Sequence, residues 1–163
     1  MDPLNSTNPK PKTIGVISDT HGLIRPGIES QLAGCDRILH AGDIGDSRVL
    51  DRLNRIAPVV AVRGNMDYGS WSRALPVREM VEIDGIFLYL LHDLYQLDVD
   101  PAAAGIHVVV SGHTHQSKLF RKDGVLYLNP GSAGHRRSHY PVSMATIRIE
   151  GEDLSPRIHE IDE

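Results

Sequence analysis

The sequence predicts an α/β fold in which two β-sheets stack face to face with helices on the outside. Two observations predict it. The first half of the chain alternates short apolar runs with amphipathic stretches, in the order strand, helix, strand, helix, strand. The second half holds short apolar runs joined by turn dipeptides, which is typical of β-hairpins. We therefore expect a parallel half and a hairpin-rich half.

The first half predicts three strands and two helices. Each strand is a short run rich in apolar and β-branched residues, and the second helix carries Val49, Leu53 and Ile56 at helical spacing. In chain order, the strands are expected at residues 13–18, 37–40 and 59–62, and the helices at residues 26–32 and 47–56. Strands linked by helices pair in parallel with a right-handed crossover, so this part of the sheet is expected to be parallel.

The second half predicts hairpins at two Asp-Gly dipeptides. Asp84-Gly85 and Asp123-Gly124 each separate two apolar runs, and this dipeptide favours a tight hairpin turn. The strands expected in this half are residues 80–83, 86–91, 106–110, 118–120, 125–128, 143–149 and 155–161. The last two flank Gly151 and are grouped here with the hairpin-rich half.

Composition restricts the class of protein. The 163 residues, 40% of them hydrophobic, suit one domain, expected over residues 13–163 after a flexible lead-in of residues 1–12. The formal net charge of -4 argues against a large basic face, so no stable nucleic-acid complex is expected. No apolar run approaches the roughly 20 residues of a membrane span, so no membrane partner is expected. The single Cys35 excludes a disulfide framework and favours a reduced, cytoplasmic setting.

Polar side chains that commonly bind metals follow five of the predicted strands. The carboxyl ends of parallel strands meet at one edge of a sheet, which is where such sheets bind ligands. The residues found there are Asp19, His21, Asp43, Asn65, Asp67, His92, His113 and His115. Each one alone is typical of a cap or a turn, whereas their joint placement at strand ends predicts a metal site.

The predicted ligands are numerous enough for two metal ions. We expect Asp43 to bridge them, because it follows the central part of the parallel sheet and paired metals lie about 3.5 to 4 Å apart. The other ligands expected are Asp19, His21 and His115 for the first ion, and Asn65, His92 and His113 for the second. Nitrogen and oxygen donors without thiolate suit Mn²⁺, which we favour, or Fe²⁺, Ni²⁺ or Zn²⁺.

The charge of this predicted centre favours an anionic substrate. Two divalent ions bring four positive charges and two aspartates remove two, which leaves a positive pocket. A small phosphate ester fits that field. A water molecule bridging both ions would be hydroxide at neutral pH and could attack phosphorus in line, with Asp43 and Asn65 as the catalytic residues.

The segment after residue 128 is expected to be structural. Asn129-Pro130-Gly131-Ser132 is typical of a turn after a strand, and no phosphate-loop or dinucleotide-binding motif occurs. His135, Arg136, Arg137 and His139 are expected in a solvated loop, because so few cations are not enough for a nucleic-acid footprint.

Taken together, the motifs resemble those of the calcineurin-like metallophosphoesterases. The motifs that carry the resemblance are Ser18-Asp19-Thr20-His21-Gly22, His40-Ala41-Gly42-Asp43, Val62-Arg63-Gly64-Asn65-Met66-Asp67, His92, Gly112-His113-Thr114-His115 and Asn129-Pro130-Gly131-Ser132. They run in order from about residue 14 to residue 132 and so cover most of the chain. Within the family, the chain looks most like the small bacterial and archaeal phosphodiesterase branch of YfcE type.

The resemblance implies a four-layer sandwich of two mixed β-sheets flanked by helices, and phosphodiester hydrolysis at a dinuclear centre bridged by Asp43. It also implies that Asn65 contacts both metal and phosphate, and we expect Arg63 to contact the phosphate. Residues expected to support the ligands without binding metal themselves are His40, Asp67 and Asp93. A homodimer or higher homo-oligomer is common in the family.

Two residues depart from the family pattern. Met66 stands where many larger members carry a histidine that protonates the leaving oxygen, and a thioether cannot act as an acid. Activated or cyclic diesters are therefore expected to react faster than alkyl phosphomonoesters. Asp93 stands where the family has glycine after the ligand histidine, and it either orients a neighbouring group or weakens the positive field.

Two other functions stay open at the level of the sequence. Proteins of similar fold, including a retromer coat subunit, serve as protein-binding scaffolds with degraded metal sites. This chain keeps ligand-capable residues at every expected position, which favours an enzyme. The second alternative is a phosphomonoesterase.

Overall fold

The structure is a computed structural model that describes residues 9–137 and 139–162. The chain folds into two mixed five-stranded sheets. The first sheet contains, in spatial order, β10 (Asp153–Ile161), β9 (Val142–Glu150), β1 (Lys12–Ile17), β2 (Arg37–His40) and β3 (Val59–Ala61). Its strands β1, β2 and β3 are parallel, as predicted, and β9 runs antiparallel to both β1 and β10. The first strand begins at Lys12, one residue earlier than expected, and residues 1–8 of the expected lead-in lie outside the described residues.

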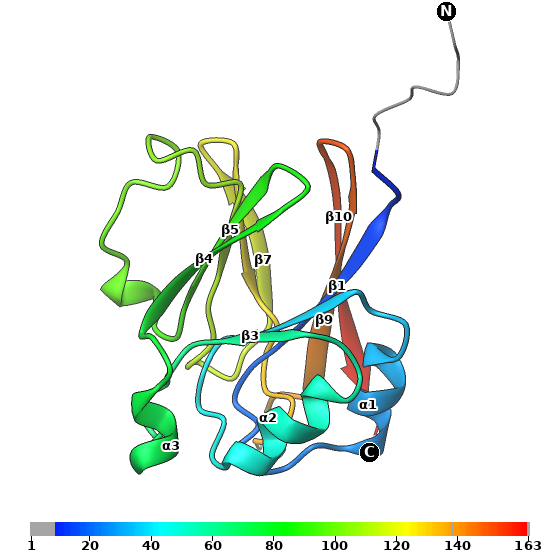
Figure 1. Cartoon of the computed structure of the whole chain (residues 1–163), viewed down its shortest axis with the longest axis vertical. Helices are drawn as coiled ribbons and strands as arrows, with labels where there is room; N and C mark the ends of the chain where they lie inside the picture. Colours follow the sequence, from blue (N-terminus) through cyan, green and yellow to red (C-terminus); the bar gives the residue numbers. More distant parts are fainter. Residues whose placement is uncertain (1–8, 138, 163) are drawn as a thin grey trace, which may run out of the picture.

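The second sheet lies beside the first and has its own parallel centre (Figure 1). Its strands, in spatial order, are β4 (Arg78–Ile83), β5 (Ile86–Leu91), β6 (Val108–Val110), β8 (Val125–Asn129) and β7 (Lys118–Lys122). The central strands β5, β6 and β8 are parallel, and antiparallel hairpins add β4 and β7 at the edges. The carboxyl ends of the three central strands therefore face the same way.

Both Asp-Gly hairpins are confirmed. Asp84 and Asp123 have φ of 51° and 52°, and the glycines after them have φ of 84° and 78°. Two consecutive residues with positive φ are the signature of the type I′ turn, whose twist matches that of the flanking strands. These two aspartates therefore have a conformational role in the turns.

The C-terminal hairpin joins the first sheet, whereas the sequence pattern grouped it with the hairpin-rich half. Strand β9 pairs with β1 along a register that matches Lys12 with Ile149 and Val16 with Ala145. The alternation of apolar residues in β9 indicates only that one face is buried. The choice of partner strand depends on long-range packing, which a local pattern does not encode.

The space between the sheets is filled by aliphatic side chains from both. Ile14 and Val16 of β1 pack in one cluster with Leu88 and Leu90 of β5, and Ile147 of β9 belongs to the same cluster. All five side chains are fully buried. Alternate residues of each strand point to this inner face, so burial here fixes the register of both sheets.

Helices α1 (Pro26–Leu32) and α2 (Ser47–Asn54) cover the outer face of the first sheet, where Leu32 and Leu53 are fully buried. The outer face of the second sheet is covered by the segment that follows β5, which contains the 3-10 helix η1 (Leu94–Gln96). The short helix α3 (Ser70–Arg73) follows β3. Neither η1 nor α3 was predicted, because helices this short carry no periodic pattern. Among the described residues, no helix is long and apolar enough to cross a membrane.

Candidate metal centre

The predicted ligands lie together where the carboxyl ends of both sheets meet. Asp19 and His21 follow β1, Asp43 follows β2, and Asn65 follows β3 a few residues after its end. From the second sheet, His92 follows β5 directly, and the loop after β6 carries the remaining two predicted ligands. Backbone hydrogen bonds join the loops of each sheet, from Asp19 N to the Gly42 carbonyl (2.9 Å) and from Gly112 N to the His92 carbonyl (2.9 Å). The site therefore spans the two sheets.

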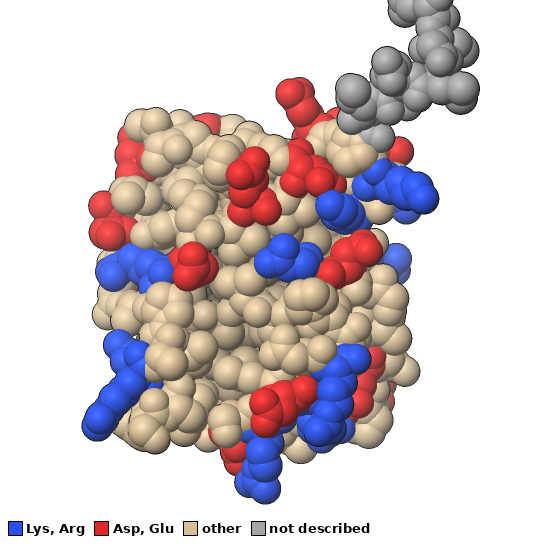
Figure 2. Space-filling model, in the orientation of Figure 1, with Lys and Arg blue, Asp and Glu red and all other residues tan. Residues whose placement is uncertain are grey.

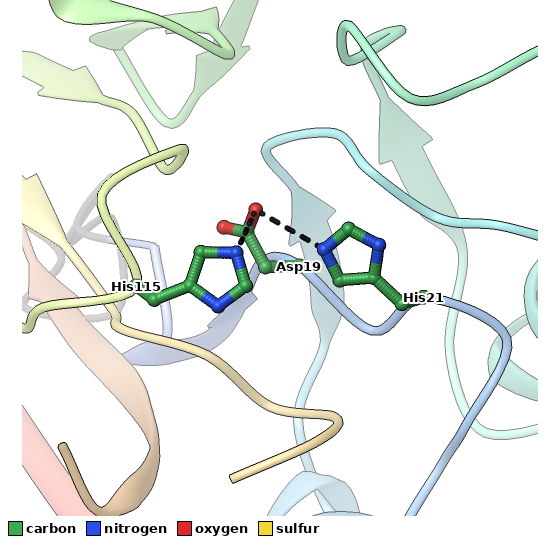
Figure 3. Close-up of side chains that lie close together, drawn as sticks. All are labelled: Asp19, His21 and His115. Atoms are coloured by element: carbon green, nitrogen blue, oxygen red, sulfur yellow. Dashed lines mark ion pairs between the residues drawn. The ribbon is translucent and has the colours of Figure 1, made fainter. Parts of the chain in front are cut away.

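One compact group contains Asp19, His21 and His115 (Figure 3). Asp19 Oδ1 lies 3.3 Å from His115 Nε2 and 3.9 Å from His21 Nε2. The two imidazole rings stack with their centroids 5.3 Å apart. One ligand atom from each of the three residues lies within 4.8 Å of the other two, which is close enough for one ion to contact all three residues.

A second compact group contains Asp19, Asp43 and His92. His92 Nε2 lies 3.2 Å from Asp43 Oδ2 and 4.0 Å from Asp19 Oδ1. Asp43 Oδ2 is also 3.7 Å from His21 Nε2 of the first group. Each of the two carboxylates thus faces imidazole nitrogens of both groups, which is the arrangement that two neighbouring ions would need.

Asn65 and His113 form a pair at the exposed side of the centre. His113 Nδ1 lies 3.2 Å from Asn65 Oδ1, and its ring contacts that of His92 edge to face, with centroids 5.1 Å apart. His113 is outside both compact groups, and its Nε2 lies 4.0 Å from Asp93 Oδ2. These two predicted ligands are therefore next to the second group, and His113 is not a member of it.

Several buried atoms of the centre lack a hydrogen-bond partner. Asp19 Oδ1, His21 Nε2, His92 Nε2 and His115 Nδ1 make up four of the seven buried, unbonded side-chain atoms among the described residues. A buried polar atom costs free energy unless a water molecule or an ion completes its bonding. Carboxylate and imidazole donors suit divalent transition metals. The residues present therefore fit a metal centre.

The backbone at the centre is held in an unusual conformation. Five predicted ligands have left-handed φ values between 47° and 73°, namely Asp19, His21, Asp43, His113 and His115. The other two non-glycine residues with positive φ, among the residues described, are the aspartates of the Asp-Gly turns. Strained backbone persists only where the surrounding structure holds it, and it concentrates at functional sites.

The electrostatics keep both carboxylates ionised. Burial alone raises the pKa of Asp19, but the close approach of His115, the hydrogen bond from Ser18 and the charge of His92 together outweigh it and lower the pKa below its ordinary value. Burial likewise raises the pKa of Asp43, whereas His92 and the Met66 N–H lower it by a larger amount. Although burial lowers the pKa of His92, the neighbouring carboxylates of Asp43 and Asp19 raise it overall. A divalent ion bound between these groups would take the place of that proton.

The predicted supporting residues have different partners. His40 is fully buried, accepts a hydrogen bond from Gly42 N at Nδ1 (3.1 Å), and contacts Thr20 Oγ1 through Nε2 (2.9 Å). Asp67 accepts hydrogen bonds from Gly45 N (2.9 Å) and Gly64 N (2.8 Å), which joins the loops after β2 and β3. Both residues therefore hold loops that carry predicted ligands.

Asp93 and Arg63 lie on one side of the centre. The Asp93 carboxylate caps η1 by accepting a hydrogen bond from Tyr95 N (3.0 Å), so this residue has a structural role besides its approach to His113. Arg63 and Asp93 line a cavity of about 240 Å³ that also touches Asn65 and His92. The predicted phosphate contact of Arg63 stays a prediction.

A larger cavity opens over the centre and includes residues that the sequence did not assign to it. The cavity has a volume of about 580 Å³ and is lined by five of the predicted ligands together with Met66, His135 and Arg137. Asn129 supports the loop after β6, because its Nδ2 donates to the Gly112 carbonyl (2.9 Å) and lies 3.1 Å from Thr114 Oγ1. Asn129 is the last residue of β8, and His135 and Arg137 follow that strand. Because β8 is parallel to β6, the rule that located the other ligands applies to these three residues as well.

Fold and site together define a metallophosphoesterase-type protein, with two stacked mixed sheets and an Asp/His centre at their shared edge. The family model for the calcineurin-like phosphoesterase superfamily domain matches residues 13–152. The chain belongs to this superfamily, as the motifs predicted. The predicted sandwich of two mixed sheets is confirmed as well.

Curated relatives support the same assignment. The chain is 36% identical over 159 residues to a protein of Methanothermobacter thermautotrophicus named a probable metallophosphoesterase, covering 89% of this chain and 90% of the relative. It is 38% identical over 132 residues to another protein named a probable metallophosphoesterase, from Methanocaldococcus jannaschii, covering 73% of this chain and 67% of the relative. A phosphodiesterase of the latter organism is 28% identical over 137 residues, covering 72% of this chain and 82% of the relative.

Solved structures share the fold at lower sequence identity. Vacuolar protein sorting 29 (Vps29) from Cryptosporidium parvum superposes with a TM-score of 0.80 at 21% identity, covering 94% of this chain and 93% of the other. The phosphoesterase YfcE from E. coli superposes with a TM-score of 0.66 at 22% identity, covering 92% of this chain and 100% of the other. These two likenesses concern the fold, which accordingly occurs both in a phosphoesterase and in a protein named for vacuolar sorting.

Proposed function

We propose that this phosphoesterase-family protein is a phosphodiesterase that works with two divalent metal ions. One observation carries the proposal: two compact ligand groups share Asp19, and four of their side-chain atoms are buried and unbonded. A single-ion site would not need two groups that share a carboxylate. The phosphodiesterase among the relatives supports the same reaction class.

The residues fit two ions as follows. Asp19, His21 and His115 would hold the first ion, and His92 with Asn65 and His113 would hold the second. The two compact groups have Asp19 in common, but we propose Asp43 as the ligand that bridges the ions, as the sequence predicted, because its Oδ2 lies 3.7 Å from His21 Nε2 of the first group and 3.2 Å from His92 Nε2 of the second. Such ions, when bound, acidify the attacking water and hold the phosphate oxygens. Mn²⁺ is the proposed ion, with Fe²⁺, Ni²⁺ and Zn²⁺ as alternatives that the same donors accept.

The residues around the centre favour diesters with good leaving groups. Asn65 is exposed at the cavity wall, so its amide is placed to donate a hydrogen bond to a phosphate oxygen. Met66 lines the same cavity and is 48% exposed, but its thioether cannot give a proton to a departing alkoxide. A leaving group that departs without protonation, such as an aryl oxide, therefore suits this site.

The partners we propose follow from the surface and the site. Lys and Arg are interleaved with Asp and Glu on the face seen in Figure 2, which is typical of a solvated surface. We propose a small phosphate ester as the substrate and the cytoplasm as the location of the protein. We also propose that the chain forms a homodimer or a higher homo-oligomer, and measurement of its mass in solution tests this.

Asp43→Asn tests the proposed centre. We expect loss of bound metal and a fall in turnover of at least about a hundredfold, because even residues that only support metal ligands contribute 10- to 100-fold. The measurements are metal content after gentle purification and hydrolysis of bis(p-nitrophenyl) phosphate with and without Mn²⁺. Asp123→Asn is a matched control, since Asp43 and Asp123 have φ of 55° and 52° and asparagine tolerates this conformation. Normal turnover by Asp43→Asn would contradict the shared-ligand role.

The same assay distinguishes the two alternative functions. A protein that binds no metal and hydrolyses neither substrate with any of the four ions would be a scaffold. The structural similarity to Vps29 favours this alternative, and one Vps29 structure contains a bound cyclic peptide. Faster hydrolysis of p-nitrophenyl phosphate than of bis(p-nitrophenyl) phosphate would indicate a phosphomonoesterase.

A further inference from the structure

Among the described residues that line the cavity over the metal centre, Arg137 is the one arginine and none is a lysine. The residues that line this cavity are buried at its floor and exposed at its rim. Asp43 and His115, at its floor, are 3% and 4% exposed, whereas Met66, His135 and Arg137 are exposed at the rim. A phosphate held at the floor would therefore leave the remainder of its molecule beside the rim.

The loop that carries Arg137 is bonded to the loop that carries Asp19. Ala133 N donates to the Ser18 carbonyl (2.9 Å), and Ser132 Oγ donates to the Asp19 carbonyl (3.3 Å). Gly134 packs against the same loop so closely that a Cβ there would lie 2.2 Å from the Thr20 carbonyl oxygen. The backbone leading to the rim is thereby held against the metal centre.

A turn then directs the chain back from the rim. Tyr140 N donates to the Arg137 carbonyl (3.0 Å), and the two residues form an isolated antiparallel bridge. Arg25 adds a bond from the side of α1, since its Nε donates to the Gly134 carbonyl (2.7 Å). The Arg137 main chain is therefore anchored on both sides.

The Arg137 guanidinium has no hydrogen-bond or ion-pair partner among residues 9–137 and 139–162. Some other arginines have a carboxylate partner, such as Arg48 with Asp46 (2.6 Å) and Arg78 with Asp98 (3.4 Å). Asp43 is the one carboxylate that lines the cavity in the part of the chain that the structure describes, and it belongs to the metal centre. Arg137 thus brings an uncompensated positive charge and a planar set of donors to the cavity rim.

We propose that Arg137 forms a second anion subsite, which binds a phosphate or carboxylate group of the substrate other than the phosphate that reacts. The proposal rests on the proposed phosphodiesterase function and names its substrate class: small phosphodiesters that carry a second anionic group. A guanidinium binds phosphate and carboxylate through two parallel hydrogen bonds. A volume of about 580 Å³ is also in the range of cavities that hold whole small molecules and exceeds what one phosphate group needs.

Two chromogenic substrates that differ in one group test the subsite. They are thymidine 5′-(p-nitrophenyl phosphate) and the same compound with a 3′-phosphate, so the bond broken and the leaving group are identical. With Mn²⁺, we expect the wild-type protein to show a KM about tenfold lower for the second compound. Arg137→Ala should abolish that difference by raising KM for the 3′-phosphorylated compound alone, with kcat unchanged, and Arg137→Lys should restore part of it.

Arg136→Ala is the matched control, because Arg136 is exposed beside Arg137 in the chain and does not line the cavity. It should leave both substrates unaffected. If Arg136→Ala lost the preference for the 3′-phosphorylated compound as fully as Arg137→Ala, general charge attraction would explain the preference, and the subsite would be overturned. An equal effect of Arg137→Ala on both substrates would place Arg137 at the reacting phosphate and would also overturn it. So would the absence of any preference in the wild-type protein.

A binding measurement separates the subsite from the catalytic function. If neither substrate is hydrolysed, the proposed function fails, and calorimetry then compares thymidine 5′-monophosphate with thymidine 3′,5′-bisphosphate on the protein incubated with Mn²⁺. Tighter binding of the bisphosphate that is lost in Arg137→Ala and kept in Arg136→Ala supports the subsite without turnover. Equal binding of the two nucleotides to the wild-type protein overturns it.

Discussion

Individual side chains of the centre are oriented by neighbours that bind no metal. His92 Nδ1 lies 2.7 Å from the Ala41 carbonyl, so it carries the hydrogen and donates, which leaves Nε2 free to face Asp43 and Asp19. Hydrogen bonds of this kind set the tautomer and ring orientation of metal-binding histidines. The Met66 N–H similarly donates to Asp43 Oδ1 (2.8 Å) and leaves Oδ2 to face the imidazoles.

His40 gives a prediction about pH. Burial lowers the pKa of His40 from 6.5 to about 3, so the residue is neutral in the fold and takes up a proton on unfolding below pH 6.5. The stability that depends on neutral His40 is complete above pH 6.5 and is lost as the pH falls towards 3. His40→Gln keeps hydrogen-bonding groups but cannot titrate. The difference in unfolding free energy between wild type and variant should shrink by about 1.4 kcal/mol for each pH unit below 6.5.

Urea unfolding in EDTA at several pH values between 4 and 8, on both proteins, makes this measurement. Removal of metal ensures that metal loss does not add to the pH dependence. Parallel stability curves for the two proteins would show that His40 does not change its protonation on unfolding.

Met66 gives a prediction about leaving groups. Met66→His should raise the rate on an alkyl phosphomonoester such as phosphoserine by tenfold or more, because a positioned general acid contributes about 10²- to 10⁴-fold when its geometry is ideal. Hydrolysis of bis(p-nitrophenyl) phosphate should change little, since an aryl oxide departs without a proton. Met66→Gln is the control of similar size that cannot supply a proton. Equal gains for both variants would point to cavity shape as the cause.

At the scale of elements, the centre depends on the loops that follow five strands, β1, β2, β3, β5 and β6. Gly112 shows how closely the loops after β1 and β6 approach, since a Cβ there would lie 2.0 Å from Ser18 Oγ and 2.7 Å from Asp19 Oδ2. The His113 N–H in turn donates to Asp19 Oδ2 (3.1 Å). One carboxylate is thereby held by loops of both sheets.

The packing between the sheets gives a stability prediction. Leu90→Ala in β5 should lower the unfolding free energy by about 2 to 5 kcal/mol, because Leu90 is fully buried and its loss leaves a cavity. Leu119→Ala in β7, where the side chain is 38% exposed, should cost less than about 1 kcal/mol. Urea unfolding of both variants measures the difference. Equal costs would mean that the inner faces of the sheets do not form the main core.

At the scale of the whole molecule, the candidate centre joins the two sheets. Asp19, His21 and Asp43 come from loops of the first sheet, while His92 and His115 come from loops of the second. An ion that binds residues from both would hold the sheets together at this edge, and it would bind the folded chain far better than the unfolded one.

Metal removal should therefore lower the melting temperature. At a free metal concentration of one hundred times Kd, binding adds about 2.7 kcal/mol, which corresponds to roughly 5 to 10 °C for a domain of this size. Thermal unfolding with Mn²⁺ and with EDTA measures the shift. Asp43→Asn should show little or no shift under the same conditions. An equal shift in that variant would place the stabilising ion elsewhere.

The local pattern of the sequence was sufficient for most elements and for the strand ends. Residues 26–32, 37–40 and 86–91 were predicted with the bounds that the structure shows. Side-chain periodicity and the left-handed preference of Asp-Gly are properties of a few neighbouring residues, so a short window of sequence contains them. The ligand candidates followed from the same reasoning, because each one lies in the segment after a recognisable strand.

Tertiary structure decided which distant parts meet. It placed β9 beside β1, gave Asp19 contacts with both ligand groups, left His113 beside Asn65, and brought Arg137 from an expected solvated loop to the rim of the cavity. These outcomes depend on contacts between residues far apart in the chain, whose free energy comes from burying one surface against another. A single sequence determines the candidates for such contacts through its residue types, and only the packed fold selects among them.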